Sequence, residues 1–209
     1  MKRTMLFTAL FVSASLLSYA QDNRDEFKFG VKGGFTLSNV YDSKGEEFDA
    51  DAKLGYTAGL GLDIPIGAVL GIHPEVLITQ KGFKGGGSLL GQNFNYSTTT
   101  TFLEVPILVA LKPTEYLTIV AGPQFAYLLN ERKRFDSSPF SYDQEQEFEN
   151  DNIRKNILGF VGGLELNFDH ITVGGRVGVD FQSNRGDGTS DTPRYKNVWG
   201  QLTVGYKFF

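Results

Sequence analysis

Apolar and polar residues alternate along the last part of the chain, residues 195–209. One face carries apolar and small residues and the other carries mainly polar ones, as Gly200, Leu202, Val204, Tyr206 and Phe208 alternate with Gln201, Thr203, Gly205 and Lys207. A period of two is typical of a β-strand with one apolar face. On its own, this segment fits an edge strand of a soluble sandwich as well as the closing strand of an outer-membrane barrel.

The same alternation predicts seven further strands, at residues 27–37, 53–64, 68–81, 97–111, 116–129, 156–168 and 171–181. We expect long loops at residues 38–52, 82–96, 130–155 and 182–194, and short turns at residues 65–67, 112–115 and 169–170. Long and short connections alternate, so an antiparallel meander places all the long loops at one end. We therefore predict an all-β fold, namely an eight-stranded antiparallel up-and-down transmembrane β-barrel.

A soluble eight-stranded barrel is the main structural alternative, because small barrels of both kinds have eight strands. It would place its apolar residues inside. Here the apolar faces are nearly free of charge over about nine to eleven residues, the length that a tilted membrane strand needs. The opposite faces carry isolated charges among glycines, which suits a narrow polar lumen. Aromatic residues near the predicted strand ends, among them Phe27, Phe168 and Tyr127, suit the two membrane interfaces.

The first 20 residues are predicted to be a secretory signal peptide, and residues 21–209 the barrel domain. Lys2 and Arg3 form a basic start, residues 5–17 form a short apolar run, and cleavage is expected after Ala20. A buried N-terminal helix is the alternative. After residue 20 no apolar run approaches the ~18 residues of a transmembrane helix, so a membrane location would require a barrel.

The composition argues against a nucleic-acid partner. Without Lys2 and Arg3, 18 basic residues remain against 24 acidic ones, a net charge near −6. Surfaces that bind nucleic acid are usually basic. The chain has no cysteine, so disulfides do not hold the fold. We expect no cofactor and no metal, because no phosphate-binding glycine motif or metal-ligand spacing stands out.

Charged residues on the polar faces are expected to point into the lumen. These are Lys32, Asp63, Glu75, Glu104, Glu165, Arg176, Asp180 and Lys207. Side chains fill an eight-stranded barrel, and a buried charge without a partner is costly. We therefore predict a structural, salt-bridged plug centred on Arg176, Glu75 and Glu104. A small ion path is the alternative.

Residues for catalysis are scarce. The two histidines are His73, expected in the lumen, and His170, expected in a turn at the short-turn end. An outer-membrane hydrolase would need a histidine with a serine or aspartate near the opposite rim. We therefore expect no enzyme activity, and keep two alternatives: a lipid-modifying enzyme on the same barrel and a soluble periplasmic binding barrel.

The predicted loop after residue 130 separates its charges. A basic cluster that could meet lipopolysaccharide phosphates is followed by an acidic run that could hold divalent cations: Arg132, Lys133 and Arg134, then Glu145, Glu147 and Glu149. A solvated loop or a strand extension beyond the membrane is the alternative.

Several segments together resemble the PorT-like outer-membrane β-barrel family. They are GVKGGFTLSNV (30–40), HPEVLITQKG (73–82), FLEVPILVALKP (102–113), AGPQFAYLL (121–129) and VGYKFF (204–209). The resemblance implies an eight-stranded outer-membrane barrel, and some relatives are tied to protein secretion. It supplies no catalytic residues. Glu75 and Glu104 match its recurrent inward glutamates, which are interpreted as structural.

The sequence thus predicts a small integral protein of the cell outer membrane with a plugged polar lumen. It would act through its outer loops in binding, envelope integrity or support of protein secretion. The expected partners are outer-membrane lipid and lipopolysaccharide, a secretion or envelope protein, and the barrel-assembly machinery, which would recognise the C-terminal strand ending at Phe209.

Overall fold

The computed structural model describes residues 24–42, 50–89, 92–137, 140–146, 154–184 and 195–208. Within them the chain forms nine strands: β1 (Lys28–Asp42), β2 (Asp51–Pro65), β3 (Leu70–Leu89), β4 (Gln92–Thr114), β5 (Leu117–Ser137), β6 (Phe140–Gln146), β7 (Asn156–Phe168), β8 (Ile171–Asp180) and β9 (Tyr195–Lys207). No helix in this described part is long and apolar enough to cross a membrane. The predicted signal peptide and Phe209 lie outside the described residues, so both expectations stay predictions.

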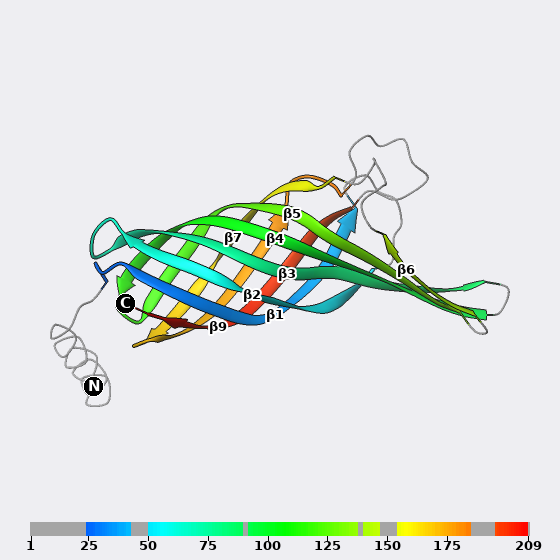
Figure 1. Cartoon of the computed structure of the whole chain (residues 1–209), viewed down its shortest axis with the longest axis horizontal. Coiled ribbons are helices and arrows are strands. Elements are labelled where there is room, and N and C mark those ends of the chain that lie inside the picture. Colours follow the sequence, from blue (N-terminus) through cyan, green and yellow to red (C-terminus); the bar gives the residue numbers. More distant parts are fainter. Residues whose placement is uncertain are drawn as a thin grey trace, which may run out of the picture.

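Eight of these strands close into a barrel. Neighbours pair in the order β4-β3-β2-β1-β9-β8-β7-β5, and β4 also pairs with β5. The first and last strands of the ring, β1 and β9, are antiparallel, with Phe35 opposite Leu202. Figure 1 shows the ring, with β1 beginning and β9 ending at the same end. The predicted eight-stranded up-and-down barrel is confirmed, and β6 stands outside the ring.

The apolar faces of the barrel strands point outward and the polar faces point inward. Val177, Phe35 and Leu54 expose 68, 64 and 63% of their surface, whereas Thr36 and Glu104 are completely buried. All eight barrel strands carry such exposed apolar side chains. A continuous apolar wall of this size is unfavourable in water and favourable in hydrocarbon. This is the inside–outside arrangement of a membrane barrel and the reverse of a soluble one.

Apolar side chains pack inside the lumen beside the polar ones. One cluster of buried side chains contains Leu108, Ala110, Val120, Val161 and Trp199. A second contains Phe102, Ala126, Leu128 and Ile157. Most of these residues come from β4, β5 and β7, where they alternate with inward polar residues such as Glu104 and Glu165. The interior is therefore filled by apolar packing as well as by charge, and polar residues still form most of the buried positions, as predicted.

Two segments predicted as long loops contain strands instead. β3 and β4 stay paired as far as Leu89 and Gln92, while β5 continues beside β4 to Ser137 and then pairs with β6. We call this four-stranded extension the projecting sheet; it consists of residues 82–89, 92–101, 130–137 and 140–146. It leaves the barrel at the end opposite the start of β1 (Figure 1).

Glycine and asparagine normally mark loops, which is why the alternation misses this extension. Residues 98–101 are four threonines, however, and β-branched residues favour strands. A Cβ atom on Gly85 would lie 2.3 Å from the ring of Tyr96 on the neighbouring strand. The glycine therefore makes room for an aromatic side chain instead of forming a turn.

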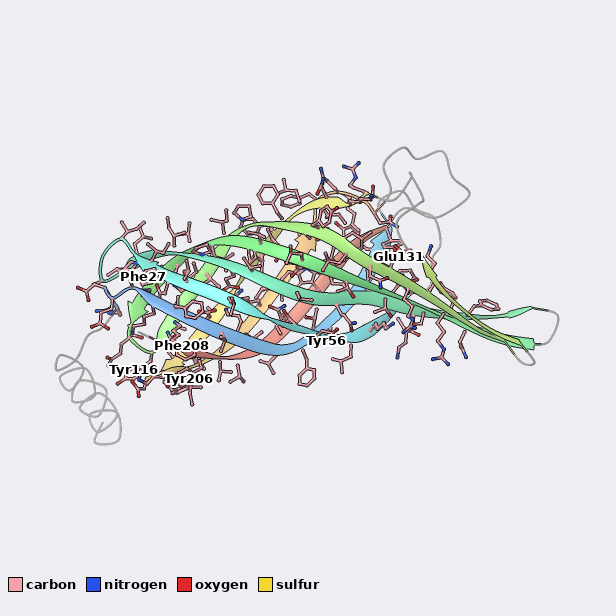
Figure 2. The ribbon with its side chains drawn as sticks, viewed as in Figure 1. Phe27, Tyr56, Tyr116, Glu131, Tyr206 and Phe208 are labelled. Atoms are coloured by element: carbon pink, nitrogen blue, oxygen red, sulfur yellow. The ribbon has the colours of Figure 1, made fainter. Side chains whose placement is uncertain are left out.

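Aromatic side chains surround the short-turn end of the barrel. Figure 2 shows Phe27, Tyr116, Tyr206 and Phe208 gathered there. Phe208 stacks on Phe29 with ring centroids 5.7 Å apart. At this end the chain reverses tightly after Phe168, and Asp169 adopts a positive φ of 54°, which aspartate tolerates better than most residues. This ring of aromatics suits the interface between hydrocarbon and water.

Candidate functional site: the lumen and the projecting sheet

Four charged side chains from four strands meet inside the lumen, and we call them the central cluster: Lys32 on β1, Glu75 on β3, Glu165 on β7 and Arg176 on β8. Arg176 donates through Nη1 and Nη2 to the two oxygens of Glu75, at 2.7 Å each. Its Nη2 also donates to Glu165 Oε1 at 2.5 Å. Lys32 Nζ donates to the same two carboxylates, at 2.7 and 3.1 Å. Two cations balance two anions.

A glycine on the neighbouring strand creates the space for this cluster. Gly163 lies directly opposite Arg176. A Cβ atom at Gly163 would come within 2.7 Å of Arg176 Cγ and 2.3 Å of the Gly175 carbonyl oxygen. The arginine side chain can therefore lie across β7 only because position 163 has no side chain.

A second group, the turn-end cluster, gathers around Asp63 and consists of Asp63, His73, Lys112 and Lys207. Lys112 Nζ lies 2.7 Å from Asp63 Oδ1, and His73 Nε2 lies 2.8 Å from the same oxygen. Lys207 Nζ is 3.7 Å from Asp63 Oδ2. His73 Nδ1 also lies 3.8 Å from Glu165 Oε2, so this cluster touches the central one.

The residues that precede β1 are hydrogen-bonded to the last residues of β4. Arg24 Nη1 donates to the carbonyl oxygens of Lys112 and Pro113, at 3.0 and 3.3 Å. Lys112 Nζ donates back to the Arg24 carbonyl oxygen at 2.9 Å. Because Lys112 also pairs with Asp63, these hydrogen bonds link the segment before β1 to the turn-end cluster.

A third group, the arm-end cluster, lies nearer the projecting sheet and consists of Lys81, Glu104, Asp180 and Asn197. Lys81 Nζ is 2.7 Å from Glu104 Oε1 and 3.6 Å from Asp180 Oδ1. Asn197 Nδ2 donates to Asp180 Oδ2 at 2.6 Å. The ring of Trp199 lies 4.9 Å from Lys81 Nζ, which adds a cation–π contact.

The sequence predicts that Glu104 joins Arg176 and Glu75 in one cluster, and this prediction is wrong. Glu165 takes that place, and Glu104 pairs with Lys81. Alternation shows which face a residue occupies, but partners across a barrel depend on the stagger of strands that are not neighbours. The structure places all eight predicted lumen residues in the three clusters, which divide them as follows: Lys32, Glu75, Glu165 and Arg176 centrally, Asp63 and Lys207 at the turn end, and Glu104 and Asp180 at the arm end.

Four members of the three clusters are missing from the predicted set of charged lumen residues: His73, Lys81, Lys112 and Asn197. The predicted set holds three cations against five anions, and this imbalance could have indicated that two further cations lie in the lumen. Lys81 and Lys112 bring these lumen residues to five of each sign. Lys112 falls in a predicted turn, and so the alternation does not assign it to either face.

The predicted basic and acidic loop segments are paired strands of the projecting sheet. The register sets Arg132 opposite Glu145, Lys133 opposite Gln144 and Arg134 opposite Asp143. Each arginine position of β5 thus faces an acidic position of β6, and opposite charges across a strand pair favour pairing. The strand extension that the sequence left as an alternative is what the structure shows. Glu147 and Glu149 lie outside the described residues.

A bulge changes which residues of β5 face inward. Thr101 pairs with Asn130 whereas Phe102 pairs with Leu128, so Leu129 is an extra residue. After it, Glu131 is buried, with its carboxylate 3.0 Å from Lys133 Nζ, while Arg132 and Arg134 are exposed. Figure 2 shows Glu131 where the barrel passes into the projecting sheet. No group of three or more histidines or acidic residues suited to a metal ion occurs among the described residues.

The family model for the outer membrane protein beta-barrel domain matches residues 19–184. The chain belongs to this family. The apolar wall therefore faces the hydrocarbon of the outer membrane, and the protein resides there. No protein with curated annotation matches the chain. The finer resemblance to PorT-like proteins stays a prediction.

Solved structures of small bacterial barrels are similar to this chain at low identity. Ail of Yersinia pestis, in complex with the heparin analogue sucrose octasulfate, is 14% identical, with coverage of 88% of this chain and 99% of that chain and a TM-score of 0.48. Neisserial surface protein A is 12% identical, with coverage of 86 and 97% and a TM-score of 0.48. OprG of Pseudomonas aeruginosa is 14% identical, with coverage of 88 and 97% and a TM-score of 0.41. At these values they carry no weight for function.

Proposed function

We propose that the barrel is a closed anchor and that its projecting sheet binds a macromolecular partner outside the membrane, in support of envelope integrity or protein secretion. The observation that carries this proposal is the contrast between the two parts. Ion pairs and apolar side chains fill the lumen, whereas four hydrogen-bonded strands extend beyond the wall. Outer-membrane barrels turn their short connections to the periplasm, so the projecting sheet faces outward.

The chemistry of the projecting sheet supports a role in recognition. Lys84, Arg132 and Arg134 are exposed, and Phe135 exposes 42% of its surface. Strand pairing already orders the backbone that carries these side chains, so binding costs little further backbone entropy. The resemblance to PorT-like proteins favours a secretion protein as the partner. The proposal assigns no catalytic step to the protein.

Contacts with lipopolysaccharide and with the barrel-assembly machinery remain part of the proposal. Arg132 and Arg134 are exposed on one face of β5, where they could meet lipopolysaccharide phosphates. The apolar face of β9, with Leu202, Val204 and Tyr206 exposed, suits recognition during assembly.

Photo-crosslinking in whole cells tests this function. A crosslinking amino acid is placed at Lys84 and Arg134, and as a control at Leu164, which is exposed on the barrel wall. A discrete protein adduct is expected from the two sheet positions and none from Leu164. The adduct is identified, and the purified partner should then bind the barrel in nanodiscs.

A truncated variant provides the second measurement. Lys84 pairs directly with Ser97, and Arg132 with Glu145, so an Asn-Gly turn can replace residues 85–96 and another can replace residues 133–144. The barrel should still fold, as shown by a mobility shift on boiling, but should no longer bind the partner. The proposal is overturned if the sheet positions give no adduct above that of Leu164 and the truncated variant restores the envelope barrier of a deletion strain fully.

A further inference from the structure

A groove lies on the outer wall of the barrel where β4, β5 and β7 approach the end with the projecting sheet. Its volume is about 600 Å³, and it is open to the outside. Its wall includes the outward side chains of Leu103 and Val105 from β4, Phe125 and Tyr127 from β5, and Leu158 from β7. Phe125 and Tyr127 expose 56 and 45% of their surface. This part of the groove is apolar and faces hydrocarbon.

The groove exists because two strands separate. β5 and β7 are paired from Leu117 as far as Tyr127, which lies opposite Asn156. One further bond, from the Leu128 amide to the Lys155 carbonyl at 2.8 Å, joins them, and β5 then pairs with β6 instead. The outer wall is therefore recessed where β5 and β7 separate, and a ligand can lie in this recess.

The rim of the groove is cationic. Arg154, Lys155 and Gln182 line this end. The Arg154 amide donates to the Asn184 carbonyl oxygen at 2.9 Å, and the Leu158 amide donates to the side-chain oxygen Oε1 of Gln182 at 3.1 Å, so two hydrogen bonds from backbone amides hold the segment in place. Arg154 Nε is buried and has no hydrogen-bond partner among the described residues. None of the described residues that line the groove is acidic.

The ligand that fits this combination is an amphiphile with an anionic head. The apolar part lies below the rim, at the depth of acyl chains, and the cations lie above it, at the depth of head groups. Arginine and lysine bind phosphate through charge-assisted hydrogen bonds. We propose that the groove binds lipopolysaccharide of the outer leaflet. Its acyl chains lie along Phe125 and Leu158, and a phosphate of its lipid A part contacts Arg154 and Lys155. This site does not depend on the function proposed for the projecting sheet.

Native mass spectrometry of the detergent-solubilised full-length barrel, purified from outer membranes, tests the site. The probes are bisphosphorylated lipid A, dephosphorylated lipid A and phosphatidylglycerol. Lipid A with both phosphates should bind one to one, and about tenfold more tightly than either of the other two. Dephosphorylated lipid A has no phosphate for the cations to contact, and phosphatidylglycerol has one phosphate and only two acyl chains. Equal binding of phosphatidylglycerol would overturn the assignment to lipopolysaccharide.

Three variants locate the site. Arg154→Gln/Lys155→Gln should weaken lipid A binding about tenfold through the lost phosphate contacts. Val105→Trp fills the apolar part without changing charge and should weaken it as well. Lys84→Gln/Lys196→Gln removes two positive charges on other strands, away from the groove, and should bind as the wild type does. Unchanged binding by both groove variants, or an equal loss in the Lys84/Lys196 control, would overturn the proposal. All variants are first checked for the mobility shift of a folded barrel.

Discussion

Arg176 on β8 binds both carboxylate oxygens of Glu75 on β3 across the lumen, with N–O distances of 2.7 Å. These strands are not neighbours in the ring, so the contact braces opposite parts of the wall. Two parallel hydrogen bonds between arginine and a carboxylate form one of the strongest side-chain contacts. Because both groups are almost completely buried, each is costly to leave without its partner.

Replacing Arg176 with methionine is expected to destabilise the barrel strongly. Arg176→Met leaves Glu75 and Glu165 with Lys32 as their remaining cation in the central cluster. Removing one partner of a buried ion pair typically costs about 3–5 kcal/mol. The free energy of unfolding is measured by urea titration in lipid vesicles. Arg134→Met, at an exposed position of the projecting sheet, is the matched control and should change it by less than about 0.5 kcal/mol. Equal losses in the two variants would contradict the role of the cluster.

A double-mutant cycle distinguishes the observed network from the predicted one. Arg176 contacts Glu75, whereas Glu104 contacts Lys81. The cycle of Arg176→Met with Glu75→Gln should give a coupling energy above about 1 kcal/mol, because the residues interact directly. The cycle with Glu104→Gln should be additive within about 0.5 kcal/mol. A strong coupling of Arg176 to Glu104 would show that the three clusters act as one unit.

Residue alternation is sufficient to predict the barrel and the face of each strand. Leu202 and Val177 are exposed and Arg176 and Gln201 are buried, as a period of two requires. The same rule fails at the projecting sheet. There glycines such as Gly85 accommodate an aromatic neighbour, and the extra residue Leu129 shifts the alternation of β5 by one position.

The partners inside the lumen could not be predicted in the same way. Glu104 and Glu165 are both buried acidic residues on inward faces, and nothing local to either one identifies its cation. The choice between Lys81 and Arg176 depends on how far each strand is displaced along the barrel axis. That displacement is set by the whole ring of strand pairs, including the bulge at Leu129. The excess of anions in the predicted lumen set indicates that further cations lie in the lumen, but it does not identify their positions.

Gly163→Ala is expected to destabilise the barrel, whereas Gly175→Ala should be tolerated. An alanine Cβ at Gly163 would lie 2.7 Å from Arg176 Cγ and 2.3 Å from a backbone oxygen, while nothing lies within 4 Å of the Cβ position at Gly175. Overpacking of this kind costs typically about 1–3 kcal/mol. The urea midpoint of the two variants provides the comparison. A lower midpoint for Gly175→Ala than for Gly163→Ala would contradict the packing of the central cluster.

Fluorescence of the single tryptophan tests which face of β9 points inward. Trp199 is 4% exposed and packs in the lumen, whereas Leu202 on the same strand is 59% exposed on the outer wall. Acrylamide in water should hardly quench Trp199 in vesicles, because its side chain is almost completely buried. Brominated lipid should quench a Trp199→Phe/Leu202→Trp variant much more strongly than the wild type. Equal quenching of the wild type and the variant by brominated lipid would contradict the assignment of Trp199 to the lumen and of Leu202 to the lipid-facing wall.

Conductance of the pure protein in a planar lipid bilayer tests the closed lumen most directly. The three ion clusters and the apolar packing around Trp199 fill the interior, so the wild-type barrel should show no steady conductance under an applied voltage. Protection of the barrel from protease in vesicles of the same lipid confirms insertion. A steady, reproducible single-channel conductance from inserted wild-type protein would contradict the account, since it would require a continuous water path through the clusters.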